Sequence, residues 1–511
     1  MAMATRQLNI ELLPAEQLLR EFLLDCSQLV PGLETWITGG WVRDRLLGIP
    51  SSDLDLALNN LTGKEFVTVL QAFFARPEIA QKYSEKASCL GMSQPYFSRA
   101  HIAKKNPKMS KKLETAGCIL FGLDVDLVNL RKEVYDGRSR DPDMEFGTAA
   151  EDASRRDATV NALFFHLERQ EVVDFTGWGI KDLDARTMRT PLEPKQTLMD
   201  DPLRVLRLIR VASKLGFSIA PETARCTLDP EVHRALDTII TRDRVGAELD
   251  KMMAGSNTET AFDFLFDFHL YSPIFFRSDS TVLENLASQH PAWRIQSASS
   301  SPWPRTWPLA YNMLGRILVG QSNLSHLIRS YENIEYLWLL AAYSPLAGLR
   351  QALRKEIVRE AASSIKASAK AAKLLDDSLG KFDSIRTMVA CFEEQAGQCC
   401  SRGECETLHQ DTAKDNVTSF QVSLFESMLE KYANFADFVL YQKLQNAVLG
   451  RPLLNGIEIQ DLFGLQKGGK YLQIITEKLL KWQFDNAEAT KEDCKKWLLQ
   501  EKYVLGLPTT G

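Results

Sequence analysis

The order of apolar and polar residues divides the chain into two parts, with the change near residue 200. In the first part, aspartates and apolar residues alternate with a period of two over residues 52–58, which is typical of a strand with one buried face. Residues 36–38 and 118–131 predict two further strands, one short and one long. Apolar residues at helical spacing over residues 66–74 predict a helix between them.

From about Asp201 onward, apolar residues recur at spacings of three and four, as in Leu203, Leu206 and Ile209. This spacing predicts amphipathic helices and no strands. The predicted fold class is therefore α+β, with an N-terminal head built on a small mixed β-sheet and all-α domains after it. Two segments rich in loop-forming residues are predicted domain boundaries, at about 296–308 and 395–410.

The chain length and the net charge limit the number of domains and the way in which nucleic acid can be bound. A chain of 511 residues is too long for one hydrophobic core, so three or four domains are expected. The net charge is −5, so any binding to nucleic acid must use local basic patches. One such patch is the lysine-rich segment 104–112, for which a solvated loop and an RNA contact are equally favoured interpretations.

Nine cysteines in a chain of this length are too few for a disulfide scaffold and indicate a reducing compartment. Acidic residues among the leucines of the first 26 positions argue against a secretory or mitochondrial leader, and no apolar run reaches the roughly 18 residues that span a bilayer. We therefore expect cytoplasmic or nuclear residence and no membrane association, with a mitochondrial pool from a longer precursor as an alternative. For Cys399, Cys400, Cys405 and His409, free thiols are favoured over a zinc site because the spacing fits no standard finger.

The strongest chemical signal is a glycine pair followed by a basic residue and two aspartates, all within 17 positions: Gly39, Gly40, Arg43, Asp53 and Asp55. Glycines at a strand end let backbone N–H groups approach an anion, and a helix that starts there adds its positive dipole end. The arginine can then donate two hydrogen bonds to phosphate oxygens. The two aspartates project from one face of a strand, where they can share oxygen-liganded cations such as Mg²⁺.

This arrangement resembles the signature of the DNA polymerase β-like nucleotidyltransferase superfamily. The resemblance implies that Asp53 and Asp55 are catalytic and bind two Mg²⁺ ions, which align a 3′-hydroxyl for in-line attack on the α-phosphate of a nucleotide. It also implies a third carboxylate on a neighbouring strand. Asp124 and Asp126 share a face of the next strand, and Asp126 is preferred because related enzymes place a carboxylate there; alternatively, both only pair with nearby Lys or Arg side chains.

The segment 155–163 carries an Arg-Asp pair before an apolar stretch, which by itself favours a helix cap with a salt bridge. Beside the first motif it resembles the second signature of class II tRNA nucleotidyltransferases. That resemblance implies that Arg156 contacts phosphate and that Asp157 and Asn161 contact ribose hydroxyls. A contact to the 2′-hydroxyl distinguishes ribonucleotides from deoxyribonucleotides.

The segment 200–210 predicts a helix that Asp201 caps and in which arginines recur every third residue: Arg204, Arg207 and Arg210. Taken alone, such a stripe is more often a solvated helix face. With Asp201 at its head, the segment resembles the templating motif of the same family, which implies that all four residues bind the nucleotide.

An ionised Asp only accepts hydrogen bonds and an Arg only donates them. Cytosine and adenine both present an amino donor beside a ring-nitrogen acceptor, whereas uracil and guanine present the reverse order. A pair formed by Asp201 and Arg204 would therefore accept C and A and leave unsatisfied polar groups against U and G. One such group costs about 1–3 kcal/mol, or roughly 10- to 100-fold in selection.

Taken together, these motifs resemble the CCA-adding class II tRNA nucleotidyltransferases of the poly(A) polymerase superfamily, in their fungal and yeast-like branch. The resemblance implies that the 3′-terminal CCA is added to tRNA from CTP and ATP without a template. An enzyme that adds only CC, only A or poly(A), or a non-catalytic tRNA-binding protein, is the alternative. The implied ligands are two Mg²⁺ ions, CTP, ATP and tRNA, with no protein partner and a monomeric state expected. The predicted division is a catalytic head (1–172), a neck with the nucleotide-selecting helix (173–255), a helical body (256–400) and a helical tRNA-binding tail (401–511).

Overall fold

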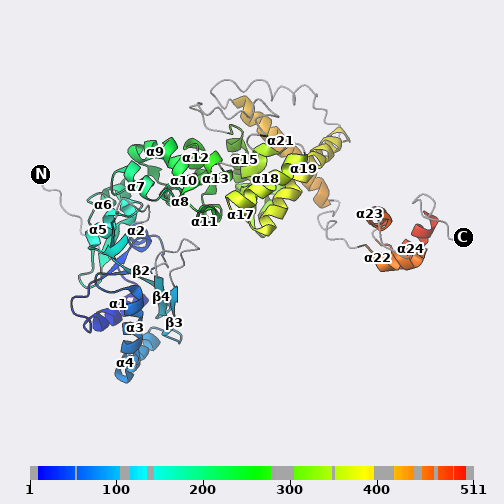
Figure 1. Cartoon of the computed structure of the whole chain (residues 1–511). Helices are drawn as coiled ribbons and strands as arrows, with labels where there is room; N and C mark the ends of the chain where they lie inside the picture. Colours follow the sequence, from blue (N-terminus) through cyan, green and yellow to red (C-terminus); the bar gives the residue numbers. More distant parts are fainter. Residues whose placement is uncertain are drawn as a thin grey trace. The chain divides into compact units, whose positions relative to one another are not determined.

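The computed structural model forms two compact units, Met1–Arg316 with Glu332–Phe382, and Ile317–Tyr331 with Asp383–Gly511 (Figure 1). The structure describes residues 10–51, 54–103, 115–134, 143–277, 280, 282, 285, 304–347, 351–395, 419–441, 452–464, 470–486 and 488–501. The lysine-rich segment 104–112 and the Cys399–Cys405 and His409 positions lie outside these ranges, as do residues 1–9.

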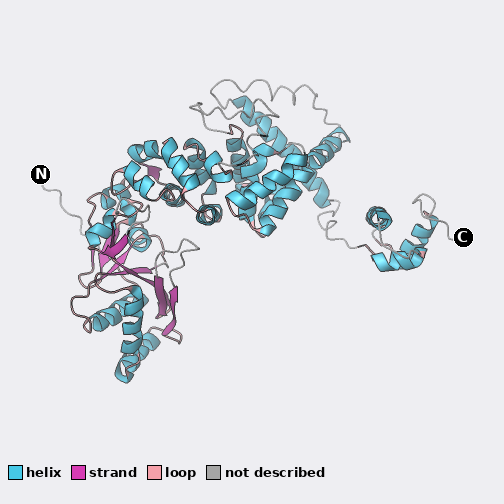
Figure 2. Cartoon of the chain, in the orientation of Figure 1, coloured by secondary structure: helices cyan, strands magenta, loops and turns pink. Residues whose placement is uncertain are grey.

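The first unit contains a seven-stranded mixed sheet, in agreement with the predicted α+β class (Figure 2). The strand order is β3-β4-β5-β2-β1-β8-β9. In the described part of the chain, β2 and β5 are parallel, and the other neighbouring strands of this sheet are antiparallel. The strands span Thr35–Thr38 (β1), Leu54–Leu58 (β2), Phe97–Ala103 (β3), Thr115–Leu120 (β4), Leu123–Asn129 (β5), Leu163–His166 (β8) and Glu171–Asp174 (β9). Two small pairs accompany it, Arg131–Val134 (β6) with Asp143–Phe146 (β7) and Thr187–Met188 (β10) with Ser218–Ile219 (β11).

The segment 118–131 is not the single strand that its apolar pattern predicted. It contains the end of β4, a turn, and β5, which pairs antiparallel with β4. The turn residues Phe121 and Gly122 both have positive φ, 51° and 79°. A two-residue connection with positive φ at both positions matches the twist of the flanking strands, so the apolar pattern continues through a tight hairpin.

The two faces of the sheet differ in what covers them. Apolar residues such as Leu54, Leu56 and Leu127 are buried, on the face covered by α3 (Gly63–Phe74), which contacts β4 and β5. The predicted helix over 66–74 is therefore confirmed. Helices α1 (Pro14–Ser27) and α4 (Pro77–Cys89) pack beside α3 on this side. Since side chains alternate along a strand, Asp55 and Asp126 lie on the opposite face.

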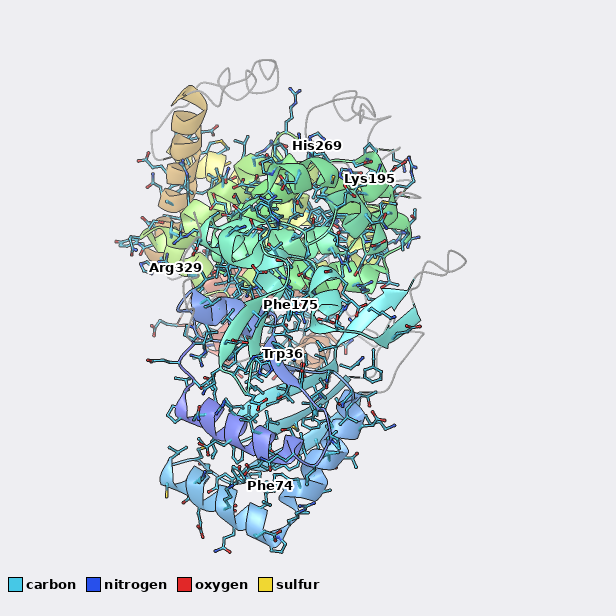
Figure 3. All side chains as sticks on the ribbon, turned by 90° about the vertical axis from the view of Figure 1, so that its left-hand side faces the viewer. Trp36, Phe74, Phe175, Lys195, His269 and Arg329 are labelled. Carbon is cyan, nitrogen blue, oxygen red and sulfur yellow. The ribbon has the colours of Figure 1, made fainter. Side chains whose placement is uncertain are left out.

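Aromatic clusters stabilise both sides of the head. On the side of α1, α3 and α4, Phe22 packs against Phe74, with ring centroids 5.8 Å apart. On the other side, Trp36 packs against Phe175 at 5.8 Å and belongs to a core completed by α5 (Ala149–Ser154). Figure 3 shows Trp36 and Phe175 near each other and Phe74 farther down among the helices. The head thus has apolar packing on both faces, and its polar site occupies part of one of them.

After β9 the described residues of the first unit form helices and loops apart from the short β10–β11 pair. Strand β11 departs from the expectation that no strand follows Asp201. The helices of this part are α6 (Gly179–Asp184), α7 (Pro194–Asp200), α8 (Arg204–Leu215), α9 (Pro221–Thr227), α10 (Pro230–Thr238), α11 (Arg242–Met253), α12 (Thr258–Asp267), α13 (Tyr271–Phe275), α15 (Trp307–Val319), α17 (Ile334–Tyr343), α18 (Gln351–Ser364) and the start of α19 (Ala369–Gln395). Helix α8 packs against α11 and α12. Trp307 is fully buried among Phe262, Tyr271 and Tyr311, which anchors α15 to this core.

The second unit is helical in its described residues, with α16 (Asn323–Arg329), α21 (Ser419–Tyr441), α22 (Gly456–Phe463), α23 (Lys470–Asp485) and α24 (Lys491–Gln500). The last three helices share a small core that includes Ile459, Leu479 and Leu498, beside stacked Trp482 and Trp497 rings 5.2 Å apart. Among the helices that the structure describes, none is both long and apolar enough to cross a membrane. The predicted division into head, neck, body and tail stays an interpretation of the sequence.

Candidate active site

One row of backbone partners crosses the central sheet and joins several polar residues. Thr38 of β1 pairs with Asp55 of β2, and Asp55 pairs with Asp126 of β5. Asp126 in turn lies opposite Gly117 of β4, which lies opposite His101 of β3. Residues that face each other across a ladder project from the same side of the sheet, so these side chains share one face.

This register distinguishes the two candidates for the third carboxylate. Asp126 is the direct partner of Asp55, whereas Asp124 is paired with Ile119 of β4. Neighbouring strands lie about 4.8 Å apart, so the carboxylates of Asp55 and Asp126 stand side by side. Asp53 lies outside the described residues, and its placement beside Asp55 stays a prediction from the sequence.

Two glycines make room for the two carboxylates. Gly39 has φ 79°, and a Cβ there would stand 3.2 Å from Asp55 Oδ2 and 3.3 Å from Arg156 Nη1. A Cβ on Gly117 would stand 2.9 Å from Asp126 Oδ1 and 2.8 Å from His101 Cε1. A side chain at Gly117 would therefore displace Asp126 or His101, and one at Gly39 would also strain the backbone.

Arg43 does not reach out from the glycine turn. It lies in α2 (Gly40–Leu46), is 5% exposed, and donates from Nε to Asp44 Oδ1 at 2.7 Å and from Nη1 to Asn161 Oδ1. Asn161 itself lies in the short helix η2 (Thr159–Asn161) and donates to Asp157 Oδ1 at 3.0 Å. The structure thus brings Arg43, Asn161 and Asp157 together, with Arg43 supporting the amide of Asn161.

Arg156 is held by an acid that the sequence analysis did not identify. Asp152 of α5 is 1% exposed, and its Oδ2 accepts from Arg156 Nε at 3.0 Å and Nη2 at 2.9 Å. Its other oxygen accepts from Arg155 Nε at 2.9 Å. Burial alone would raise the pKa of Asp152, but Arg156 and Arg155 outweigh it and hold the pKa below its usual range. Asp152 therefore fixes Arg156 in the position where it lies beside Gly39.

Asp157 links the head to the arginine stripe of α8. Its Oδ2 accepts from Arg207 Nε at 2.8 Å, while Oδ1 accepts from Asn161. Burial opposes ionisation of this carboxyl, yet Arg207 and Asn161 bring its pKa down to about 2. Asp157 is therefore a charged, buried acceptor at neutral pH, and it connects η2 with the neck.

The third arginine of the stripe also has an acidic partner. Arg210 Nε donates to Glu248 Oε2 at 2.6 Å, and Glu248 of α11 is 4% exposed. Glu248 Oε1 lies 4.0 Å from Arg207 Nη1. The stripe is thus not a purely solvated helix face, because Asp157 and Glu248 pair with Arg207 and Arg210.

Asp201 and Arg204 lie at the start of α8 but in different surroundings. Helix α8 begins at Arg204, with Leu203 as its N-cap, so Asp201 does not cap the helix as expected. Its Oδ1 instead accepts from Leu203 N at 3.2 Å in the preceding turn. Arg204 is 9% exposed and donates to two backbone carbonyls, Thr197 O at 3.0 Å and Arg155 O at 2.8 Å. These contacts hold the Arg204 guanidinium next to the segment that carries Arg156 and Asp157.

Four residues outside the predicted catalytic and nucleotide-binding set also lie in this region: His101, Asp152, Arg244 and Glu248. Asp152 had a local signal, because it precedes Arg156 by four positions in a short helix. Arg244 and Glu248 belong to the segment 240–248, which the family resemblance implies is structural support for the helix that carries Arg204. Arg244 contacts Asp201 and Glu248 contacts Arg210, over 43 and 38 positions of sequence. His101 reaches the row only through strand pairing.

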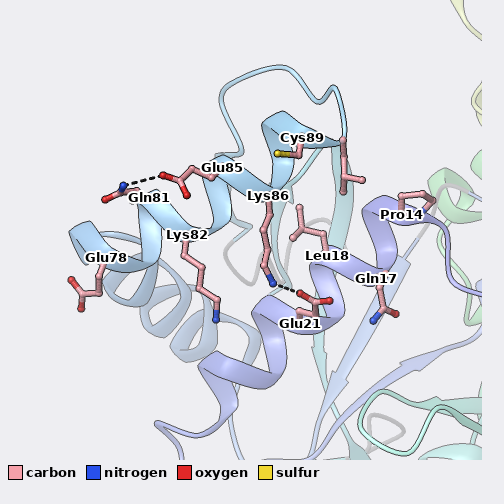
Figure 4. Close-up of a pocket in the computed structure, with 11 residues that line it drawn as sticks. Pro14, Gln17, Leu18, Glu21, Glu78, Gln81, Lys82, Glu85, Lys86 and Cys89 are labelled. Atoms are coloured by element: carbon pink, nitrogen blue, oxygen red, sulfur yellow. Dashed lines mark hydrogen bonds and ion pairs between the residues drawn. The ribbon is translucent and has the colours of Figure 1, made fainter.

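A separate hollow lies between α1 and α4, on the covered side of the sheet (Figure 4). Its volume is about 920 Å³, and its lining includes Leu18, Leu90 and the ion pair of Lys86 with Glu21, 2.6 Å apart. These residues carry none of the chemistry of the row that contains Asp55 and Asp126. The hollow is therefore not part of the candidate active site.

The donor set of the row suits a hard cation. Asp55 and Asp126 offer carboxylate oxygens side by side, and Mg²⁺ in proteins often takes one or two carboxylates together with substrate phosphate. Within the described ranges, which leave out Asp53, no group of three or more His, Cys, Asp or Glu side chains forms a metal site. A Mg²⁺ ion at this place would therefore be held by the carboxylates of Asp55 and Asp126 together with oxygens of the substrate.

Comparison with known proteins agrees with this geometry. Residues 35–189 match the poly(A) polymerase head domain. The mitochondrial CCA tRNA nucleotidyltransferase of Saccharomyces cerevisiae is 33% identical over 492 residues, covering 89% of this chain and 86% of that protein. The tRNA nucleotidyltransferase cca2 of Schizosaccharomyces pombe is 30% identical, covering 94% of both chains. Nucleotidyltransferase lcsQ of Purpureocillium lilacinum is 41% identical over 360 residues, which span 66% of this chain and 56% of that protein.

Solved structures share the fold. The apo form II of a CCA-adding enzyme has a TM-score of 0.60 at 19% identity and covers 95% of this chain and 96% of its own. The Thermotoga maritima CCA-adding enzyme, solved with tRNA, has a TM-score of 0.55 at 17% identity and covers 97% of this chain and 98% of its own. With relatives at 30% identity or more that cover most of both chains, and with a matching head domain, the chain belongs to the CCA tRNA nucleotidyltransferase family.

Proposed function

We propose that this enzyme adds the 3′-terminal CCA sequence to tRNA, using CTP and ATP and no nucleic-acid template. The observation that carries the proposal is the register that pairs Asp55 with Asp126, beside the glycine turn at Gly39 and the guanidinium of Arg156. Family membership supports the same reaction, since the Saccharomyces and Schizosaccharomyces relatives are named for it.

In the reaction, the tRNA 3′-hydroxyl oxygen forms a bond to the α-phosphorus of the nucleotide. The bond from that phosphorus to the bridging oxygen breaks, pyrophosphate leaves, and the hydroxyl proton passes to solvent. We assign Asp53, Asp55 and Asp126 to the binding of two Mg²⁺ ions, which would neutralise charge on the phosphates. Gly39 and Gly40 would let the triphosphate approach the backbone, because neither carries a side chain.

The segment that follows β7 is proposed to hold the rest of the nucleotide. Arg156, fixed by Asp152, would donate to phosphate, and Asp157 and Asn161 would accept from and donate to the ribose hydroxyls. Arg43 supports Asn161 in this proposal and does not itself need to contact phosphate. Arg207 and Arg210 would act through Asp157 and Glu248, by holding the neck against the nucleotide site.

Selection of the base is assigned to Asp201 and Arg204. Asp201 would accept the exocyclic amino proton of cytosine or adenine, and Arg204 would donate to the ring nitrogen beside it. The side chain of Asp201 is 30% exposed, which leaves its carboxylate accessible to a base. Two of the five N–H donors of Arg204 contact backbone carbonyls, and these contacts support a fixed guanidinium next to Arg155.

The tail is proposed to bind tRNA, as a solved relative is described in complex with it. Relatives in Saccharomyces and Candida are named as mitochondrial, which supports a mitochondrial pool beside the expected cytoplasmic and nuclear ones. Fractionation of cells that express the tagged chain, with immunoblots of each fraction, would test this distribution.

The test of the reaction uses a tRNA transcript that ends at the discriminator base. The full-length protein with Mg²⁺ should add two residues with CTP alone, none with ATP alone, and three when both are present. Addition that stops after CC with both nucleotides, or a long A tail with ATP alone, would assign a different activity. A transcript that already ends in CCA serves as the control and should not be extended.

A further inference from the structure

Strand β3 has one residue more than the stretch of β4 with which it pairs. Ser98 lies opposite Ile119 and His101 lies opposite Gly117, so three steps along β3 match two along β4. Such an extra residue forms a β-bulge, and the residues after it point to the other face of the sheet. Without the bulge, His101 would point toward the face that α3 covers. With it, His101 projects from the face that carries Asp126, which lies beyond Gly117 in the same row.

The side chains of His101 and Asp126 converge over Gly117. A Cβ at Gly117 would stand 2.8 Å from His101 Cε1 and 2.9 Å from Asp126 Oδ1, so these two atoms are no farther apart than the sum of the two lengths. The side chain of His101 is also exposed. The imidazole therefore borders a carboxylate that is assigned to the reaction, and a substrate can reach it.

His101 lies at the opposite end of the row from the proposed nucleotide site. Gly39 lies beside Asp55 and Arg156, at the end of β1. His101 lies beyond Asp126, on β3. In nucleotidyl transfer, the attacking and leaving oxygens lie roughly in line on opposite sides of the phosphorus. A nucleotide whose pyrophosphate leaves at the Gly39 end would be attacked from the β3 end, which brings the 3′-terminal nucleotide of tRNA next to His101.

An imidazole can bind a ribose hydroxyl in either of its charge states. The neutral ring has one N–H donor and one acceptor nitrogen, and the charged ring has two donors. A 2′-hydroxyl both donates and accepts hydrogen bonds. In the terminal nucleotide of tRNA, it adjoins the 3′-hydroxyl that attacks. A contact to the 2′-hydroxyl therefore also sets the direction of the 3′-oxygen.

We infer that His101 donates a hydrogen bond to the 2′-hydroxyl of the 3′-terminal nucleotide of tRNA. The inference rests on the proposed function and concerns the acceptor end, whereas Asp157 and Asn161 are assigned to the ribose of the incoming nucleotide. The contact holds the terminal ribose with its 3′-oxygen toward the α-phosphorus. It also makes the enzyme prefer the 3′ end of an RNA over the 3′ end of a DNA.

The experiment compares two tRNAs that end in CC and differ only in the sugar of the last nucleotide, ribose or 2′-deoxyribose. Single-turnover rates of addition from ATP are measured on both with the full-length protein and Mg²⁺. The wild type should extend the ribose end about tenfold faster, the effect of one polar contact. His101→Ala should slow the ribose end about tenfold and leave the deoxyribose end within about twofold of the wild type, because the hydroxyl and the side chain belong to one contact. His101→Gln keeps an N–H donor and should recover part of the difference.

Ser98→Ala is the matched control, because Ser98 projects from the same face of β3, opposite Ile119. It should keep the wild-type difference between the two ends. If His101→Ala does not fold, His101→Leu replaces it, since leucine fills the space without a donor. An equal loss on both ends would mean that His101 acts only through Asp126 and would overturn the inference. A wild type that extends both ends at the same rate would overturn it as well. A wild type that extends neither end with ATP would instead overturn the proposed function.

Discussion

Two parts of the candidate site arrange their acidic residues in opposite ways. In the central sheet, Asp55 stands next to Asp126 across two parallel strands. Around α8, acids stand next to arginines: Asp157 with Arg207, Glu248 with Arg210, and Asp201 with Arg244. Two like charges about 5 Å apart repel by roughly 1–3 kcal/mol in surroundings between water and a protein surface, whereas opposite charges attract. The carboxylates in the central sheet therefore suit a cation and substrate phosphate, and the acid–arginine pairs around α8 hold their side chains in place by attraction.

This contrast predicts different effects of substitution, on the reaction rate for one group of residues and on folding stability for the other. Loss of Asp55 or Asp126 should lower the reaction rate and leave folding intact. Loss of a partner in one of the buried acid–arginine pairs should lower stability, because it leaves a buried charge without its partner.

The largest effect is expected at Asp126. Asp126→Ala should lower kcat about 1000-fold, since a carboxylate that holds a catalytic cation contributes several kcal/mol to the transition state. Asp124→Ala is the matched control on the same strand face and should stay within about threefold. Single-turnover rates of CTP addition measure both. A larger loss in Asp124→Ala than in Asp126→Ala would show that the register with Asp55 does not identify the third carboxylate.

The next effect concerns the stability of the neck. Arg207→Met should lower the free energy of unfolding by about 2–4 kcal/mol, because Asp157 stays buried and charged without its main partner. Urea denaturation followed by circular dichroism measures the change. Lys251→Ala is the control, since Lys251 is 61% exposed and lies 3.8 Å from Glu248. If the two variants lost the same stability, Asp157 would not depend on its arginine.

The pH dependence of stability tests the ion pair of Asp157 and Arg207 through its acidic member. The pKa of Asp157 is lowered to about 2 from an ordinary value of 3.8. A depressed folded pKa adds stability that is present above pH 4 and is lost as the pH falls toward 2. Asp157→Asn should therefore lose less stability than the wild type between pH 4 and pH 2, by up to about 2 kcal/mol. Identical pH dependence of the unfolding free energy in both proteins would contradict the assigned charge.

The smallest effect is expected at an ion pair that is exposed and outside the site. Lys86 and Glu21 join α4 and α1 across the hollow, with side chains 45% and 39% exposed. Lys86→Ala should change the free energy of unfolding by less than about 1 kcal/mol, because exposed pairs are screened by water and salt. The ratio of kcat/KM for CTP to kcat/KM for UTP should not change. A shift in that ratio would mean that selectivity follows total charge and not the contacts of the neck.

The sequence predicted the parts of this molecule that depend on local pattern. The strand that carries Asp55 follows from the alternation of aspartates and leucines, and α3 follows from apolar residues at helical spacing. The β4–β5 hairpin was not predicted, because Phe121 and Gly122 turn the chain without interrupting the apolar pattern. Local periodicity reports which face of an element is buried and is insensitive to a turn of only two residues.

The sequence predicted which residues belong to the candidate site, but it did not predict most of the contacts that they make. Arg204 recurs in the arginine stripe with Arg207 and Arg210, yet it is buried against backbone carbonyls. Arg43 was expected at phosphate and instead supports Asn161. Both outcomes depend on segments that meet only after folding, 118 positions apart for Arg43 and 49 for Arg204. Spacing along the sequence carries no signal for such partners.

The two-residue connection between β4 and β5 has a consequence for how this gene can change. It fixes which residue of β5 lies opposite Gly117, and therefore which residue lies beside Asp55. One codon inserted between Gly122 and Asp126 would shift the strand by one position and turn Asp126 toward the buried face, with an apolar residue in its place. A change in length alone could thus abolish activity while every catalytic residue is still encoded. Variants with single-residue insertions or deletions here should be classed with active-site substitutions.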